Sequence, residues 1–103
     1  MRDPNKMPVE KDTFITIRIT NDAEIKKLNK KFRKKDYATD VLSFNLDEKL
    51  EDGSFHLGDI VVNRDQAKRQ AKDYGNTPEE EISELSAHGI LHLLGVHHDG
   101  DDH

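Results

Sequence analysis

The chain of 103 residues contains no cysteine, no tryptophan and only three prolines, and aromatic residues make up 6% of it. Without cysteine it can form neither a disulfide framework nor a thiolate metal site, so a transition-metal site must use His, Asp or Glu. No stretch approaches the roughly 20 apolar residues that span a bilayer. The start, MRDPNKMPVEKD, has no apolar signal segment and is expected to be a flexible leader over residues 1–12. These absences favour a soluble, cytoplasmic protein that does not act at a membrane.

The composition predicts one globular domain over residues 1–103. The length allows a modest hydrophobic core, and 33% of the residues are hydrophobic while 36% are charged. No internal repeat, low-complexity tract or linker divides the chain.

The formal net charge of −5 conceals an uneven distribution. Residues 1–50 carry twelve basic and nine acidic side chains, whereas residues 51–103 carry four and twelve. Seven of the ten residues from Lys26 to Lys35 are Lys or Arg. Such a run is either the solvated face of a helix or a surface that binds phosphates.

The first half of the chain alternates between two periodicities. TFITIRIT, residues 13–20, places isoleucines on one face at a period of two and predicts a strand. NDAE then provides a helix N-cap with a glutamate three residues later, followed by the helical stripe Ile25, Leu28 and Phe32. DVLSFNL, residues 40–46, predicts a second strand, and the polar loop 47–54 follows.

The second half predicts one strand and two helices. GDIVV, residues 58–62, is a short third strand, and NRDQ begins a helix that carries Ala67, Ala71 and Tyr74 and ends at Gly75. TPEE begins the last helix, with Thr77 as N-cap and proline at the first helical position. This helix is expected to run to about residue 94, where the next glycine stops it.

The segment HGILHLLGVHH, residues 88–98, contains four of the six histidines. His88 and His92 are four apart on the predicted helix, so they project from one face and can share a metal. Gly95 can turn the chain sharply, and His98 follows three residues later. Three neutral imidazoles with a fourth position open to water are typical of a catalytic zinc site. The alternative is three unrelated histidines on a buried helix, and His97 could replace His98 as a ligand.

The spacing H-x3-H-x2-G-x2-H is also that of the metzincin proteases, with one difference. Those enzymes have a glutamate base after the first histidine, where this chain has Gly89. Without that carboxylate the usual proton acceptor of peptide hydrolysis is missing, so classical protease activity is not expected.

Three ordered motifs resemble the YbeY-type zinc-dependent endoribonucleases, also called ribosomal-RNA maturation factors. HGILHLLGVHH matches the family signature H-G-x-L-H-L-x-G-x-D-H, except that His97 stands where the family has aspartate. NKKFRKKDYATDVLSF is similar to N-x-x-[YF]-R-x-K-D-x-P-T-D-V-L-S-F, with Ala38 in place of proline, and LGDIVV resembles the L-G-D-I strand. The resemblance covers about residues 13–99. The strand and helix that precede the first strand in the family, and its C-terminal helix, are not apparent.

The resemblance implies an α+β, zincin-like domain with a small mixed sheet of about four strands, three of which are visible in the sequence. It implies that His88, His92 and His98 bind one zinc ion per chain. It also implies that Arg33 faces the metal across a cleft and contributes to phosphodiester cleavage. A guanidinium can hold a phosphate with two hydrogen bonds, and the absent carboxylate at Gly89 would suit an anionic substrate. The catalytic residues expected are therefore Arg33 and His88.

Further residues have two interpretations each. Besides Arg33, the cations Lys30, Lys31 and Lys34 are expected to contact the substrate. Asp40 and Ser43 lie in a family motif, but one can cap a strand and the other can simply alternate along it. Asp59 either bonds to the histidine helix as a support for the metal ligands or caps a strand. Two lone histidines, His56 and His103, are expected to bind nothing, and the acidic tail to be a disordered end rather than a second metal site.

The function expected from these features is a zinc-dependent endoribonuclease that prefers single-stranded RNA. The resemblance implies a role in ribosomal-RNA processing, at the 3′ end of the small-subunit RNA, and in ribosome quality control. RNA and the ribosome are the expected partners, and DNA is not. The alternatives are a metal-dependent hydrolase of another substrate, such as a peptide, and a ribosome-associated binding factor with structural zinc. The nucleophile, water or the ribose 2′-hydroxyl, stays open, as do the general base and the oligomeric state.

Overall fold

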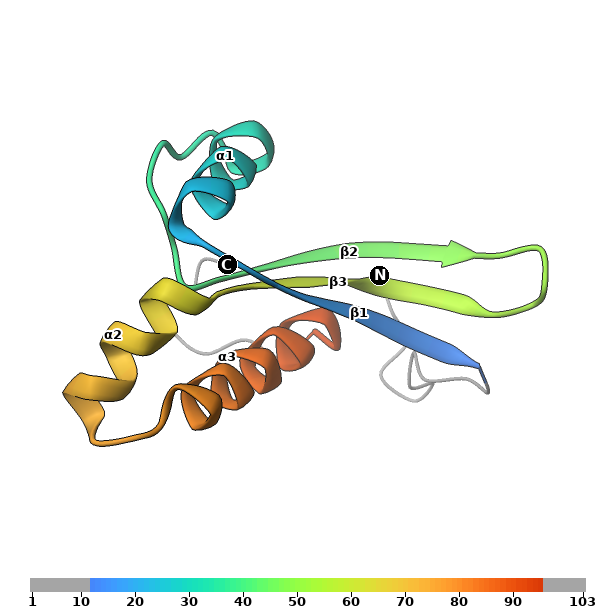
Figure 1. Cartoon of the computed structure of the whole chain (residues 1–103). Coiled ribbons are helices and arrows are strands. Elements are labelled where there is room, and N and C mark those ends of the chain that lie inside the picture. Colours follow the sequence, from blue (N-terminus) through green and yellow to red (C-terminus); the bar gives the residue numbers. More distant parts are fainter. Residues whose placement is uncertain (1–11, 96–103) are drawn as a thin grey trace.

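The computed structural model describes residues 12–95, in which strands and helices follow each other as β1 (Thr13–Thr20), α1 (Asp22–Arg33), β2 (Val41–Lys49), β3 (Phe55–Asn63), α2 (Arg64–Tyr74) and α3 (Pro78–Leu93). Within this range three strands form one mixed sheet in the order β1-β3-β2 (Figure 1). β3 pairs in parallel with β1 and antiparallel with β2. The α+β class and the mixed sheet predicted from the sequence are therefore confirmed.

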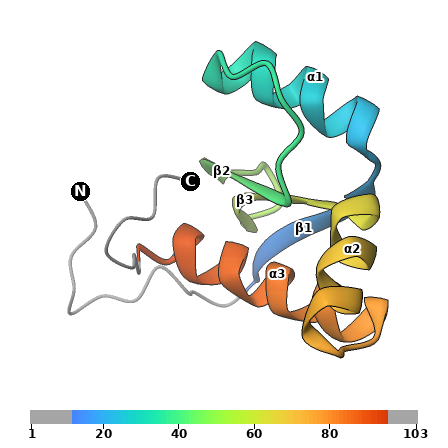
Figure 2. The same cartoon turned by 90° about the vertical axis from the view of Figure 1, so that its left-hand side faces the viewer.

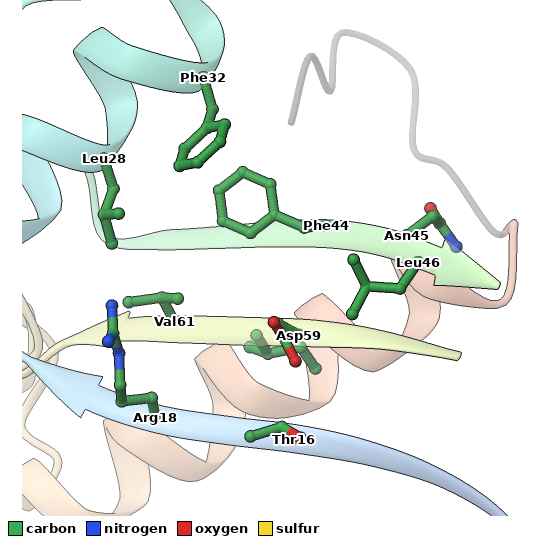
Figure 3. Close-up of a pocket in the computed structure, with 10 residues that line it drawn as sticks. Thr16, Arg18, Leu28, Phe32, Phe44, Asn45, Leu46, Asp59 and Val61 are labelled. Carbon is green, nitrogen blue, oxygen red and sulfur yellow. The ribbon is translucent and has the colours of Figure 1, made fainter. Parts of the chain in front are cut away.

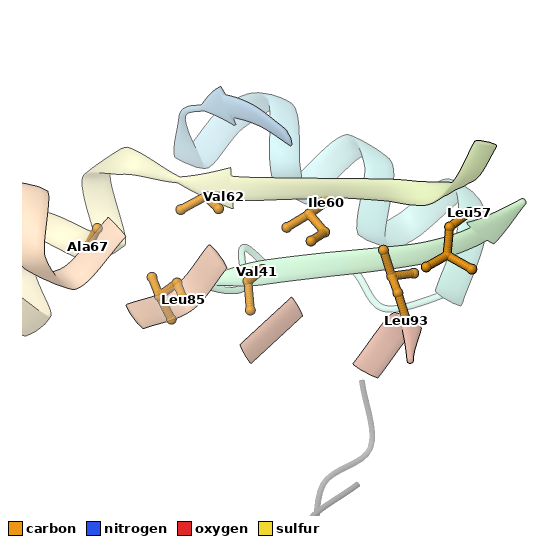
Figure 4. Packing of buried hydrophobic residues seen from close by; sticks show 7 residues of the cluster. All are labelled: Val41, Leu57, Ile60, Val62, Ala67, Leu85 and Leu93. Atoms are coloured by element: carbon orange, nitrogen blue, oxygen red, sulfur yellow. The ribbon is translucent and has the colours of Figure 1, made fainter. Parts of the chain in front are cut away.

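Helices pack on both faces of the sheet. α1 lies on one side and α3 on the other (Figure 2). On the α3 side, β2, β3 and both C-terminal helices contribute a buried cluster (Figure 4): Val41, Leu57, Ile60, Val62, Ala67, Leu85 and Leu93. On the α1 side a smaller cluster joins Ile25 to Leu42 and Val61. The central strand β3 thus supplies apolar side chains to both cores.

The hairpin between β2 and β3 is longer than the sequence predicted. β2 continues to Lys49 and β3 begins at Phe55, so the first three residues of the expected loop 47–54 are strand and five remain as the connection. The register shifts between Asn45 and Glu48, which marks a bulge that lets pairing resume beyond it. A polar alternation broken by such a bulge resembles a loop in the sequence, which explains the missed strand ends.

Two predicted apolar stripes are only partly covered. The expected stripe on β1 is half-buried at Ile15, but Ile17 and Ile19 are 45% and 43% exposed. β1 lies at the edge of the sheet, while α3 packs on β2 and β3. On α1, Ile25 is buried, whereas Phe32 near the end of the helix is 57% exposed.

A polar network joins the starts of α1 and α2 to the end of β3. Asn63 is fully buried, and its side chain accepts from the backbone N–H of Asp65 at 3.0 Å and donates to Asp22 at 2.6 Å. The Asp22 carboxylate also accepts two hydrogen bonds from Arg69, at 2.8 and 3.1 Å. These bonds, with that of Arg69 the strongest, lower the pKa of Asp22 below its ordinary value.

None of the helices between residues 12 and 95 has the length and apolar character that a bilayer crossing requires.

Candidate functional site

The local sequence fixes where α3 begins and ends. Thr77 accepts a hydrogen bond from the backbone N–H of Glu80 at 3.1 Å, and the Glu80 carboxylate accepts from the backbone N–H of Thr77 at 2.9 Å. This capping box, with Pro78 next to it, is the start that the sequence predicted. The hydrogen bonds from Thr77 lower the pKa of Glu80. At the other end Gly95 has φ +88°, a conformation that favours glycine, and it stops the helix as expected.

Two of the predicted metal ligands lie together on α3. The rings of His88 and His92 are stacked in parallel, with centroids 5.0 Å apart and planes 6° from each other. His92 is buried, with 5% of its surface exposed, and His88 is half-buried. One helix face therefore brings two imidazoles to within reach of one ion.

The third predicted ligand, His98, lies outside the described residues, as do His97, His103 and the acidic tail. Within residues 12–95 no three potential ligands form a cluster. A site with three imidazoles therefore requires a third one from beyond that range.

Gly89 has a packing role that the sequence did not reveal. A Cβ atom at this position would lie 2.8 Å from Cγ2 of Ile60 and 3.1 Å from Oγ of Ser43. The glycine lets α3 approach the sheet closely, and a side chain there would point at the strands. The structure thus gives a steric reason why no side chain stands at this position, beside the electrostatic reason that was predicted.

Two polar side chains of β2 attach the histidine helix to the sheet. Ser43, which is buried, donates through Oγ to the carbonyl of Gly89 at 3.4 Å, between the two histidines in sequence. Asn45 donates to the carbonyl of Leu93 at 3.2 Å. For Ser43 the structure thus shows a contact that supports the histidine helix α3. The contact of Asn45 was not predicted from the sequence. Its signal is that the amide follows Val41 and Ser43 on the same face of the strand, where a polar side chain can bond to whatever packs on that face.

Arg33 differs from the lysines around it. It is half-buried at the end of α1, and its Nη2 donates to the carbonyl of Ser43 at 2.8 Å. The guanidinium carbon also lies 5.7 Å from the centre of the Phe44 ring. Its Nε is buried without a hydrogen-bond partner among residues 12–95. Arg33 contacts Ser43, and Ser43 contacts the histidine helix α3, so a single residue connects the two.

The lysines predicted to contact the substrate are exposed on and after α1. Lys30 is 68% exposed and lies 3.9 Å from Asp36, a pair that contributes little to stability in water. The ammonium of Lys31 lies 5.2 Å from the centre of the Phe32 ring. Lys34 caps α1 with a left-handed backbone at φ 59°. Lys30, Lys31 and Lys34 therefore lie on a solvated, positively charged face.

Asp40 has a structural position. Its carboxylate accepts from the backbone N–H of Val41 at 2.8 Å and from the side chain of Gln70 at 3.3 Å. It therefore joins the first residue of β2 to α2, which is the capping role of the two considered for it.

Asp59 lies on the opposite face of the sheet from α3, and this corrects the suggestion that it bonds to the histidine helix. The alternation of β3 sends Ile60 towards α3 and Asp59 away from it. The Asp59 carboxylate pairs with His56 at 3.0 Å, and the same imidazole lies 3.1 Å from the hydroxyl of Thr16. His56 also stacks on Phe14, with ring centroids 4.4 Å apart, so it is not the lone histidine that the sequence suggested.

Comparison with known proteins gives consistent similarities. The family model described as "Endoribonuclease YbeY" matches residues 3–103. Curated relatives with that name include proteins of Aquifex aeolicus, 49% identical over 85 residues, and Solibacter usitatus, 52% identical over 83 residues. These alignments cover 82% and 81% of this chain, and 56% and 52% of the relatives. The chain thus spans little more than half the length of these relatives.

A solved structure is similar as well. The solution structure of TM1509 from Thermotoga maritima is 37% identical and superposes with a TM-score of 0.59. The match covers 88% of this chain and 57% of the other.

Proposed function

This chain belongs to the endoribonuclease YbeY family. On that premise we propose that the protein is a zinc-dependent endoribonuclease that prefers single-stranded RNA. The observation that carries the proposal is the arrangement of α3 against β2. It holds two parallel imidazoles on one helix face and connects them, through Ser43, to a half-buried arginine.

The residues present fit a zinc ion. His88 and His92 offer ring nitrogens from adjacent turns of one helix, and imidazole nitrogen is a preferred zinc ligand. His98, beyond the described residues, is the proposed third ligand. Zinc bound by three imidazoles would supply an activated water and polarise a phosphoryl oxygen.

Arg33 is proposed to hold the scissile phosphate. One of its nitrogens is engaged by the Ser43 carbonyl, which restricts the orientation of the planar guanidinium. The N–H groups of Nη1 and Nη2 that the Ser43 carbonyl does not engage can donate to phosphate oxygens and offset the negative charge that develops during cleavage. A residue that is already oriented loses less conformational entropy on binding than an exposed lysine. The lysines of α1, Lys30 and Lys31 among them, are proposed to attract the RNA backbone without positioning it.

The substrate that we propose is ribosomal RNA, at the 3′ end of the small-subunit RNA, with the ribosome as partner and a cytoplasmic place of action. The names of the relatives support an RNA endonuclease, and the ribosomal target is part of the proposal. We also propose a zincin-like architecture with a fourth strand for this protein.

The test combines metal analysis with an RNA cleavage assay. The purified protein is expected to contain about one zinc per chain and to cleave a single-stranded RNA, and a chelator should stop cleavage. His92→Ala should lose metal and activity. His56→Ala is the matched control, because His56 lies on the other face of the sheet, and it should keep both. Metal bound without any cleavage would favour a binding factor with structural zinc, and equal metal content in the two variants would refute the ligand assignment.

A further inference from the structure

A groove of about 500 Å³ opens on the face of the sheet that α1 covers only in part (Figure 3). One side of it is formed by Phe32 from α1 and Phe44 from β2, and the other by Arg18 and Thr16 from β1. Its floor is the central strand β3. The groove thus lies on the opposite face of the sheet from the histidines and is lined by three strands and one helix.

The aromatic side of the groove is exposed. Phe32 is 57% exposed and meets Phe44 edge to face, with ring centroids 5.4 Å apart and planes at 63°. One turn earlier on α1, Leu28 packs against the buried cluster that contains Ile25. Phe32 lies one turn further along the helix and stays exposed. A large aromatic ring left open at the mouth of a groove is suited to stacking on a flat ligand.

Positive charge borders this aromatic wall. The ammonium of Lys31 lies 5.2 Å from the Phe32 ring centre, and the guanidinium of Arg33 lies 5.7 Å from that of Phe44. Across the groove, Arg18 is paired with Glu24 at 3.0 Å and its side chain is 53% exposed. The floor also carries the Asp59 carboxylate, which pairs with His56 at 3.0 Å. An aromatic wall with cations at its edge complements a base that is attached to a phosphate chain.

We propose that this groove binds one unpaired base of the RNA strand, stacked on Phe32 and Phe44. The phosphates next to that base would then cross the end of α1 towards Arg33, which contacts Phe44 and lies against Ser43 of the same strand. The proposal rests on the proposed function and adds a binding subsite to it. It also gives a physical reason for a preference for single strands, because a paired base cannot enter the groove.

The test measures equilibrium binding of the whole chain to a short single-stranded RNA that carries the fluorescent base 2-aminopurine. Phe32→Leu keeps an apolar side chain but removes the ring, and it should weaken binding about tenfold, which corresponds to ~1.4 kcal/mol. It should also abolish the change in 2-aminopurine fluorescence. Phe32→Tyr should bind as the unaltered protein does. The matched control is Tyr74→Leu, since Tyr74 is an exposed aromatic residue on α2.

Two further comparisons separate stacking from charge. Lys31→Ala should lower the dependence of affinity on salt, whereas Phe32→Leu should leave that dependence unchanged. A strand with abasic sites should bind the unaltered protein as weakly as the intact strand binds Phe32→Leu.

The groove assignment and the nuclease assignment fail in different ways. Unchanged RNA affinity in Phe32→Leu, or equal affinity for abasic and intact strands, overturns the groove proposal even if the protein cleaves RNA. Stacking through Phe32 in a protein that does not cleave RNA would overturn the proposed function and support the groove.

Discussion

Replacing Gly89 with alanine should destabilise the protein, although alanine is the better helix former. In an exposed helix interior, alanine is favoured over glycine by about 1 kcal/mol. Gly89 is buried in the fourth turn of α3, where the helix lies against β2 and β3. The outcome therefore depends on whether packing outweighs helix propensity.

The distances in the structure indicate that packing does. The new Cβ would lie 2.8 Å from Cγ2 of Ile60, 3.1 Å from its Cδ1 and 3.1 Å from Oγ of Ser43. The last two atoms can move by rotation of a side chain. Cγ2 is fixed by the branched Cβ of Ile60, which is fully buried on the central strand, so the helix itself must move outward. Overpacking of this kind costs about 1–3 kcal/mol, which leaves a net loss of about 1 kcal/mol after the gain in propensity.

Urea unfolding followed by circular dichroism measures this difference, since a shift in midpoint at constant slope reports stability. The control is Ala87→Gly, at an exposed position of the same helix, which should lose about 1 kcal/mol by propensity alone. A Gly89→Ala protein as stable as the unaltered one, or more stable, would refute the packing argument. Because a glutamate at position 89 meets the same strands, loss of RNA cleavage in Gly89→Glu could not by itself demonstrate electrostatic repulsion.

Three other measurements test the site and the polar network. In single-turnover RNA cleavage, Arg33→Ala should be slower by about 10²-fold, and Arg33→Lys should recover only part of the rate. Lys31→Ala should change RNA affinity more than the rate. Equal effects of Arg33→Ala and Lys31→Ala would contradict a catalytic role for Arg33. Zinc at a hundredfold excess over its Kd should raise the free energy of unfolding by about 2.7 kcal/mol, and His92→Ala should abolish that gain. Because hydrogen bonds lower the pKa of Asp22, its contribution to stability is present above its ordinary pKa of 3.8 and is lost as the pH falls through the lower folded value. Acid unfolding curves should therefore decline less steeply below about pH 4 in Asp22→Asn, and identical slopes would contradict this.

Much of the fold could be predicted because its signals are local. The N-caps of α1, α2 and α3 lie where the sequence placed them, and Gly75 ends α2 with φ +73°. The strand ends beyond Asn45 were missed because a bulge depends on the partner strand, which a single segment does not show. The exposure of Ile17 likewise depends on which helices cover the edge of the sheet, and periodicity carries no information on that.

The site was predictable where one helix holds its residues and less so where the contacts cross between elements. The spacing of His88 and His92 placed both rings on one face of α3, as expected. The apolar neighbours of Asp59 on β3 indicate that its side chain points to the face opposite theirs. They do not indicate which of the two faces α3 covers, because that depends on the packing of the whole fold. The hydrogen bond from Asn45 to α3 joins residues that are far apart in sequence, and only the assembled structure shows it.

The parallel pairing of β1 with β3 has a consequence for the order in which the chain assembles. β2 and β3 are joined by a five-residue connection, so their pairing closes a short loop, whereas Thr13 must find Phe55 across α1 and all of β2. Closing the longer loop costs more chain entropy, and such contacts form late in folding. The hairpin can therefore form before β1 joins it, whereas the contact between Ser43 and Gly89, which are 46 residues apart, closes a loop at least as long as that of β1. Thr16 and Arg18 arrive with β1, so the groove that they line is completed only after the hairpin has formed.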